Sequence, residues 1–87
     1  MKFYNELNKC IENMEALISK DNLILLKRSD YAELNMYHFG LGTWIRNNVL
    51  TPDAEITKLF IKAGIKEPDD MSSFIIKCFY IKLNLNS

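Results

Sequence analysis

Apolar residues recur at intervals of three and four along the first twenty positions, and this repeat constrains the fold more than any other feature of the chain. Charged residues fall between the apolar positions, as they do on the solvent face of an amphipathic helix. Asp21 and Asn22 then interrupt the repeat. The pattern predicts a helix over about residues 2–20, with an apolar face formed by Phe3, Leu7, Cys10, Ile11, Met14, Leu17 and Ile18.

Residues 22–28 show no clear period. The run from Leu23 to Leu26 is too short and too uniformly apolar to separate a strand from a helical turn. A single strand would find no pairing partner elsewhere in this chain. We therefore predict a short apolar connector that is buried and can include helical turns.

A second helix is predicted over about residues 30–48. Asp30 followed by Glu33 fits an aspartate variant of the capping box, and the turns that follow have one apolar face. Gly40 and Gly42 lie inside this helix, where each glycine costs about 1 kcal/mol relative to alanine. We expect a reason for that cost, either the close approach of a neighbouring backbone or a break in the helix.

Two further helices are predicted to begin at prolines. Thr51-Pro52-Asp53 matches a helix start and Gly64 a helix stop, which predicts a helix over about 52–63. Pro68 with the acidic residues after it predicts a helix over about 68–84 that is apolar on more than one side, so it either lies centrally or meets another chain. The expected fold is all-α: a compact bundle of four helices in a single domain, residues 1–87.

The overall charge of the chain argues against some classes of partner. Eleven basic residues balance eleven acidic ones, so the basic excess typical of duplex-binding proteins is missing. No apolar run approaches the ~20 residues that span a bilayer, and the first residues do not resemble a signal peptide. We expect a cytoplasmic protein without membrane contact.

Residue types that are rare in this chain gather between positions 37 and 48. This stretch holds the only histidine, the only tryptophan and one of the two arginines. Tryptophan, tyrosine and arginine are the types most enriched at the energetic centres of protein interfaces. The candidate residues for binding a partner or ligand are therefore Tyr37, His38, Trp44, Arg46 and Asn47.

Arg46 also has a structural interpretation. Asp69 and Asp70 form a carboxylate pair at the predicted start of the last helix, and a guanidinium can bind carboxylates through two parallel hydrogen bonds. Such a contact would tie the second helix to the start of the fourth. A structural tie by Arg46, Asp69 and Asp70 is the competing prediction for this arginine.

The residues offer little for catalysis. A catalytic histidine needs a nucleophile or an orienting carboxylate beside it, and no serine or cysteine motif accompanies His38. A metal site needs about three or four ligands. The chain has one histidine and two cysteines that lie far apart in the sequence, which are too few to suggest such a site. We expect no catalytic residue, no metal site and no cofactor.

Two segments considered together resemble a known kind of domain. His38-Phe39-Gly40-Leu41-Gly42-x-Trp44-Ile45-Arg46-Asn47, with the later Pro68-Asp69-Asp70-Met71-Ser72, resembles a family of small uncharacterised bacterial and phage helical domains. The resemblance covers about residues 30–84 and leaves the amino-terminal helix outside. It implies a compact helical domain and supplies no activity, cofactor or catalytic residue. The segment after Asn47 departs from the family pattern, which often contains tryptophan or glycine there.

The leading hypothesis is a small non-enzymatic module that binds another protein, such as an inhibitor, an immunity-type protein or a phage-encoded antagonist. A homodimer is compatible with it. The alternative is a regulator that binds nucleic acid or a small anion in a pocket formed by Tyr37, His38, Trp44 and Arg46. An enzyme that uses His38 is a third possibility, which would require that side chain in a cleft near a carboxylate.

Overall fold

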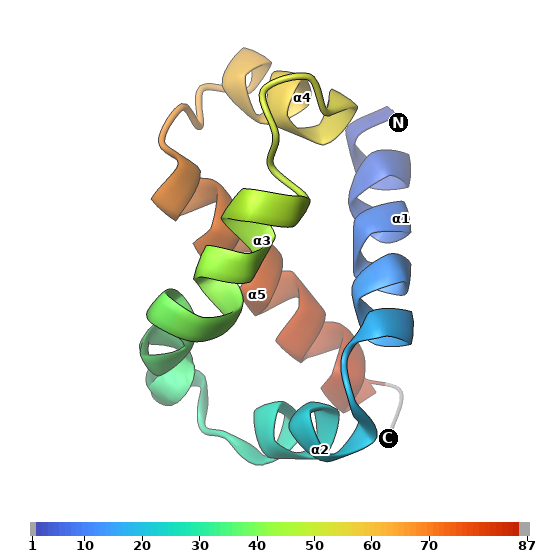
Figure 1. Cartoon of the computed structure of the whole chain (residues 1–87), viewed down its shortest axis with the longest axis vertical. Coiled ribbons are helices and arrows are strands. Elements are labelled where there is room, and N and C mark those ends of the chain that lie inside the picture. The colour runs from blue at the N-terminus through green and yellow to red at the C-terminus, as the bar shows by residue number, and fades with distance from the viewer. Residues whose placement is uncertain (1, 86–87) are drawn as a thin grey trace.

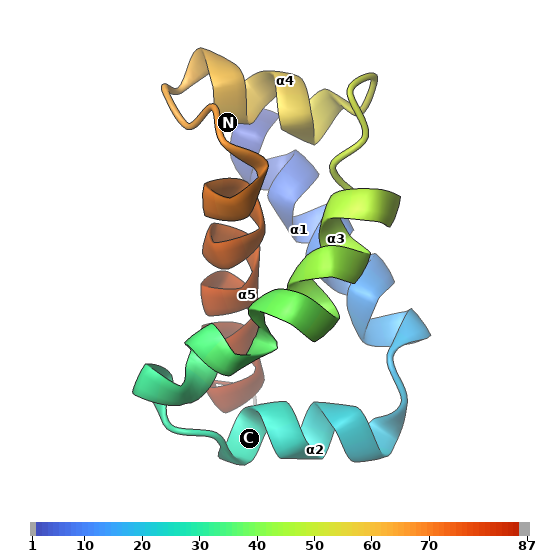
Figure 2. The same cartoon turned by 60° about the vertical axis from the view of Figure 1, so that its left-hand side comes forward.

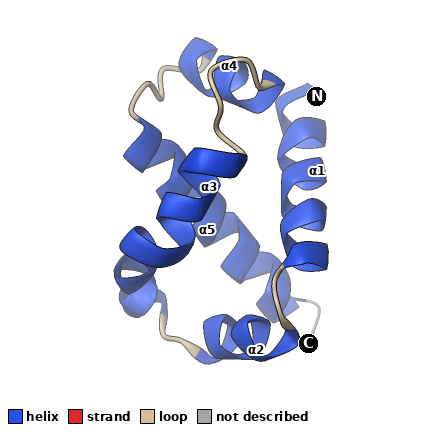
Figure 3. Cartoon of the chain, viewed as in Figure 1, coloured by secondary structure: helices blue, strands red, loops and turns tan. Residues whose placement is uncertain are grey.

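The computed structural model describes residues 2–85, apart from the side chain of His38. Every regular element in this part of the chain is a helix (Figure 3), which confirms the all-α fold class. The elements are α1 (Lys2–Leu17), α2 (Lys20–Arg28), η1 (Tyr31–Tyr37), η2 (His38–Gly42), α3 (Thr43–Asn48), α4 (Glu55–Lys62) and α5 (Pro68–Leu85). The predicted number of four helices is therefore wrong.

α5 lies at the centre of the arrangement. It packs against α1, α2, α3, η1 and η2, while α4 crosses one end of the molecule and α2 the other (Figures 1 and 2). All five α-helices, η1 and the loop after α3 contribute to one hydrophobic core. Its buried members are Leu7, Ile11, Met14, Leu26, Leu34, Ile45, Leu50, Ile56, Phe60, Met71, Ile75, Ile76 and Phe79.

The stretch predicted as a connector is the helix α2. Ser19 caps its amino terminus, with the Ser19 hydroxyl oxygen accepting a hydrogen bond from the backbone N–H of Asn22 at 3.3 Å. Lys27 and Arg28 lie in the last turn, where their charge favours the helix dipole. The helical turns that the prediction allowed are present, but the irregular, buried connector was wrong: the turns form a capped helix, and Leu25 is 62% exposed. The cap was missed because the apolar repeat of α1 continues to Ile18 and conceals it.

The predicted second helix is divided into three pieces. Residues 31–37 form a 3₁₀-helix, residues 38–42 a π-helical turn, and only residues 43–48 an α-helix. One of the two hydrogen bonds of the predicted capping box is present: the backbone N–H of Asp30 donates to Glu33 Oε1 at 2.7 Å. The helix changes from 3₁₀ to π geometry at residue 38, and the π-helical turn contains Gly40 and Gly42. A break in the helix at these glycines was one of the two expected reasons for their cost.

The boundaries of α4 follow from two turns. Thr51-Pro52-Asp53 does not begin the helix as predicted. It forms a turn in which the backbone N–H of Ala54 donates to Thr51 O at 3.0 Å, because proline suits the second position of such a turn as well as a helix start. The predicted stop is confirmed: Gly64 has a φ of 96°, and the next residue donates back to Phe60 O at 2.9 Å in a Schellman motif.

An exposed ion pair joins the starts of α1 and α4. Lys2 Nζ lies 2.7 Å from Glu55 Oε1. Their hydrogen bond is the main cause that lowers the pKa of the Glu55 carboxyl and raises the pKa of the Lys2 ammonium group. The pair therefore stabilises the fold fully at pH values between the ordinary pKa of an unfolded glutamate, about 4.3, and that of an unfolded lysine, about 10.4. That contribution disappears as pH falls through the folded pKa of Glu55 or rises through that of Lys2.

We expect the Lys2→Ala variant to raise the pKa of Glu55 toward its ordinary value, because the variant removes the hydrogen bond and the charge that hold it down. An NMR titration of the Glu55 side-chain carboxyl carbon measures this directly. A Glu55 pKa that is the same in both proteins would show that the contact is not maintained in solution.

Candidate functional site

Arg46 lies between α3 and the first turn of α5. Its Nη1 donates to Ser72 Oγ at 2.9 Å and its Nη2 to Thr43 Oγ1 at 3.0 Å. Its Nε lies 3.5 Å from Asp69 Oδ1, and only 17% of the arginine side chain is exposed. The guanidinium therefore links α3 to the start of α5, and it is turned toward the protein more than toward solvent.

Gly42 makes room for this guanidinium. A Cβ atom at position 42 would lie 3.1 Å from Arg46 Nη1, closer than most side chains allow, so the guanidinium would have to shift by a few tenths of an ångström. Ser72 is buried and donates its own hydroxyl proton to Asp69 O at 3.0 Å. The glycine and the serine thus belong to the setting of Arg46, a relation that their spacing in the sequence did not reveal.

The two aspartates differ in their relation to Arg46. The structure brings Asp69 to the guanidinium, although 68% of its side chain remains exposed, so the ion pair is screened by water. Asp70 is exposed, and its part in the tie remains a prediction. Asn47, a candidate for partner contact, is exposed on α3.

Tyr37 takes part in a second polar cluster. Its hydroxyl lies 2.7 Å from Ser29 Oγ, which itself donates to Leu25 O at 2.9 Å, so Tyr37 acts as the donor. Tyr80 of α5 donates to the carbonyl oxygen of Ser29 at 2.6 Å. Ser29 therefore connects the end of α2 to both η1 and α5. This role of Ser29 could not be predicted from a local pattern, because its partners are 8 and 51 positions away.

Tyr37 and Trp44 line a groove of about 440 Å³, which we name the Trp44 groove. It lies between the α1–α2 junction and the η2–α3 segment. Its described lining residues carry no charge at neutral pH. They are Leu17, Ile18, Ser19, Asn22, Leu25, Leu26, Tyr37, Gly40, Leu41 and Trp44.

Two leucines at the edge of the Trp44 groove are unusually exposed. Leu17 is 70% exposed and Leu25 is 62% exposed, although the repeat in the first helix placed Leu17 on the buried face. Leu17 and Trp44 also border a second, more polar groove of about 610 Å³ that includes Glu6 and Glu55. The half-buried indole of Trp44 therefore lines both the Trp44 groove and this second groove.

The remaining candidate, His38, begins the π-helical turn η2, and its side chain lies outside the described residues. Its predicted roles therefore stay predictions. Two exposed apolar side chains that were not among the candidates lie close to it in the sequence, Phe39 in η2 and Met36 in η1.

The described residues offer few groups for chemistry. Among them, no cluster of three or more histidine, cysteine, aspartate or glutamate side chains is placed to hold a metal ion. Cys10 and Cys78 are free thiols, and burial raises the pKa of each, which reduces the fraction of reactive thiolate at neutral pH. Within residues 2–85, none of the helices combines the length and the apolar character needed to cross a bilayer.

Comparison with known proteins identifies a family. The model of a family described as a domain of unknown function, DUF6794, matches residues 5–83. The match includes most of α1, which the resemblance to residues 30–84 had left outside. No curated protein and no solved structure is significantly similar to the chain.

Proposed function

From the premise that the chain belongs to the DUF6794 family, whose function is unknown, we propose that it is a small non-enzymatic module that binds another protein through the Trp44 groove. The occupant is an apolar face of a partner helix, which places large uncharged side chains between Leu17, Leu25 and Trp44. Docking of an amphipathic helix in an apolar groove is a common mode of protein recognition.

The observation that carries the proposal is the pairing of exposed leucines with an uncharged lining. Leu17 and Leu25 expose most of their surface to water beside the half-buried Trp44, and a partner would remove that surface from water. Charged residues are depleted at the centres of protein interfaces, while tryptophan and tyrosine are enriched there. The lining of the Trp44 groove has both properties.

The position of Arg46 counts against the anion-binding alternative. A site for a phosphate or nucleic acid needs a cation that faces the ligand. Arg46 instead contacts Ser72, Thr43 and Asp69, and the described lining of the groove includes no lysine or arginine. The neutral charge of the chain points the same way. Binding of oligonucleotides at about 50 mM salt is the result that would favour the alternative.

A module of this size without a credible catalytic set fits several roles. Inhibitors, immunity-type proteins and phage-encoded antagonists all act by occupying a surface of another protein, and we place the chain among them. A bacterial or phage origin and a cytoplasmic location belong to the same proposal.

Neighbouring residues of α2 provide a matched test. Leu25 lines the Trp44 groove, whereas Ile24 is also exposed, at 41%, and does not line it. We expect Leu25→Glu to weaken binding of a protein captured stoichiometrically from the native host by at least about 30-fold, because the new charge would be buried against the partner. Ile24→Glu is expected to bind within about threefold of the wild type, because surface changes away from the contact cost little.

Circular dichroism first confirms that both variants are folded. Calorimetry with the purified partner then measures the two affinities and shows whether the Trp44 groove is the interface. Equal loss of affinity in the two variants, or no loss in Leu25→Glu, would place the interface elsewhere.

A further inference from the structure

Gly40 is a glycine that the packing of the chain does not require. Its φ is not positive, unlike that of Gly64, so its backbone has a conformation that other residues adopt. A Cβ atom at position 40 would meet nothing within 4 Å from outside its own helical turn, whereas one at position 42 would lie 3.1 Å from Arg46 Nη1. Gly42 therefore makes room for a neighbour within the chain, and Gly40 does not.

A glycine within a helical segment has an energetic cost. It loses more conformational freedom on folding than alanine does, and it lowers the stability of a helix relative to alanine. Gly40 lies in the π-helical turn η2, the middle piece of the helical segment from Tyr31 to Asn48. π-helical turns occur frequently at functional sites. The cost of Gly40 therefore needs an explanation from outside the chain.

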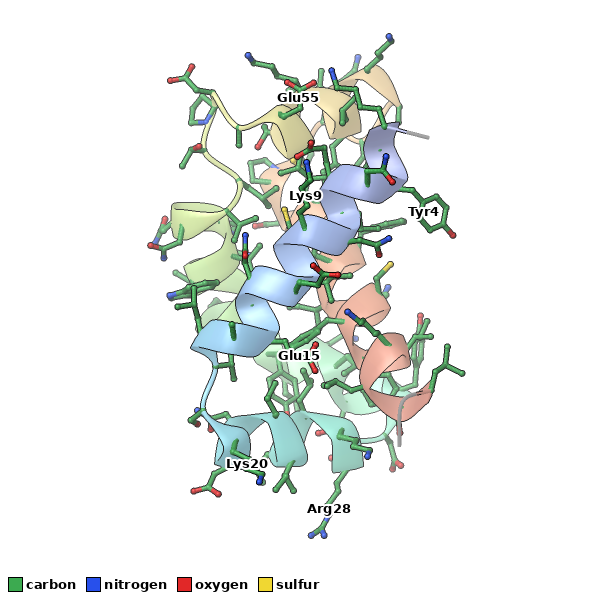
Figure 4. All side chains as sticks on the ribbon, turned by 90° about the vertical axis from the view of Figure 1, so that its right-hand side faces the viewer. Tyr4, Lys9, Glu15, Lys20, Arg28 and Glu55 are labelled. Carbon is green, nitrogen blue, oxygen red and sulfur yellow. The ribbon has the colours of Figure 1, made fainter. Side chains whose placement is uncertain are left out.

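Gly40 is placed where another molecule can reach it. It is exposed and lines the Trp44 groove together with Tyr37, three positions before it, and Trp44, four positions after it. Both aromatic side chains are half-buried against the core. Figure 4 shows the opposite wall of the groove, where α1 turns into α2 at Lys20. Gly40 thus leaves the backbone bare between two aromatic residues of one wall, and we name the open space at its Cα the Gly40 notch.

We propose that the Gly40 notch receives one large apolar side chain of the partner helix, the anchor, which packs against the Cα of Gly40 between Tyr37 and Trp44. Gly40 then determines which partners fit, because a side chain at position 40 would take the place of the anchor. This inference rests on the proposed function and deepens it, since it states which side chain the Trp44 groove selects.

The surroundings of the Gly40 notch favour an apolar anchor. The Tyr37 hydroxyl is bonded to Ser29 Oγ at 2.7 Å, and Ser19 Oγ accepts from the backbone N–H of Asn22 at 3.3 Å, so a polar anchor would compete with bonds already made. A charged anchor would find no opposite charge in the described lining. Leucine, methionine or phenylalanine would instead bury apolar area against aromatic walls, as the energetic centres of interfaces commonly do.

The two glycines of η2 give a matched test in the free protein. Gly40→Ala is expected to raise the melting temperature by roughly 2–8 °C, because alanine loses less freedom on folding and its Cβ enters open space. Gly42→Ala is expected to melt at least about 4 °C below Gly40→Ala, because its Cβ displaces the guanidinium of Arg46. Circular dichroism measures both. A Gly40→Ala variant that melts below the wild type would show that this glycine serves the fold, and the inference would be wrong.

A library of helical peptides probes the Gly40 notch without knowledge of the natural partner. Peptides of about 18 residues, free of tryptophan, are randomised among small and large apolar residues at positions i, i+3, i+4 and i+7 and selected on the wild type. Those retained change the fluorescence of Trp44, the only tryptophan of the chain, and lose at least about tenfold in affinity with Leu25→Glu. We expect them to share one large apolar residue, and we expect Gly40→Leu to weaken their binding by at least about 30-fold, because its side chain fills the notch.

A second selection, on the Gly40→Leu variant, identifies the contact itself. It is expected to yield peptides in which alanine or glycine replaces the shared large residue, with at least about tenfold higher affinity for this variant than the first peptides have. Peptides that depend on Leu25 but bind Gly40→Leu as tightly as the wild type would overturn this inference and leave the proposed function standing. A library without any peptide that depends on Leu25 would count against the proposed function, and this inference would fail with it.

Discussion

The Phe60→Ala variant is expected to lose about 3–5 kcal/mol of unfolding free energy, the largest effect of any single change considered for this chain. Phe60 is completely buried, and its ring meets those of Phe3 and Phe74 edge to face, with centroids 5.1 and 5.6 Å away. Truncation leaves a cavity where α4 packs on α1 and removes both ring contacts.

A loss of that size is a large fraction of the total stability of a domain of 87 residues, which is about 4–13 kcal/mol. Urea denaturation followed by circular dichroism measures it, and the melting temperature should fall by at least about 12 °C. Phe74→Ala is the control, because Phe74 belongs to the same ring cluster and is 36% exposed. Equal losses in the two variants would contradict the assignment of Phe60 to the centre of the core.

Replacement of Arg46 by alanine is expected to lower the unfolding free energy by about 2–3 kcal/mol, because hydrogen bonds from a charged and largely buried donor are worth more than neutral ones. Arg46→Lys is expected to recover little of this, since a lysine cannot reach Ser72, Thr43 and Asp69 with the geometry of a planar guanidinium.

Arg28 provides the comparison, because it is the other arginine of the chain and is exposed at the end of α2. Arg28→Ala should change stability by less than about 0.5 kcal/mol, and Asp69→Asn by less than about 1 kcal/mol. Denaturation of the variants side by side measures the difference. If Arg46→Ala were as stable as Arg28→Ala, the guanidinium would not hold the start of α5, and a recognition role for Arg46 would regain support.

The elements that were predicted correctly are those whose signals are local. α5 begins at the predicted proline, and Gly64 ends α4 as expected, because a proline and a left-handed glycine act within one turn. α1 was predicted from its repeat of apolar residues. The repeat does not state where a helix must stop, so the helix was predicted three residues too long, and the cap of α2 was missed.

The winding of residues 31–42 shows a different limit. A 3₁₀-helix, a π-turn and an α-helix place apolar residues at similar intervals, so periodicity alone does not separate them. Gly42 was noticed as costly in a helix, but its reason is the guanidinium of Arg46 one turn further along. That reason depends on where the start of α5 lies, which only the tertiary arrangement determines.

At the candidate site, too, some features could be predicted from the sequence and others could not. The pairing of Arg46 with an aspartate of α5 was among the predictions because the two charge types and their helix positions could be named from the sequence. The Trp44 groove could not be foreseen, since it is formed by residues from two separate stretches of the chain, 17–26 and 37–44. Leu17 and Leu25 were assigned to a buried face and a buried connector, and their exposure follows from how α1 and α2 meet.

Photo-crosslinking in the native host is the sharpest test of whether a partner protein occupies the Trp44 groove. A benzophenone amino acid placed at position 25 reports on the groove, and the same group at position 24 reports on the adjacent surface of α2. We expect one discrete crosslinked protein from position 25 and none above background from position 24. The same products from both positions, or crosslinks from position 24 alone, would contradict it.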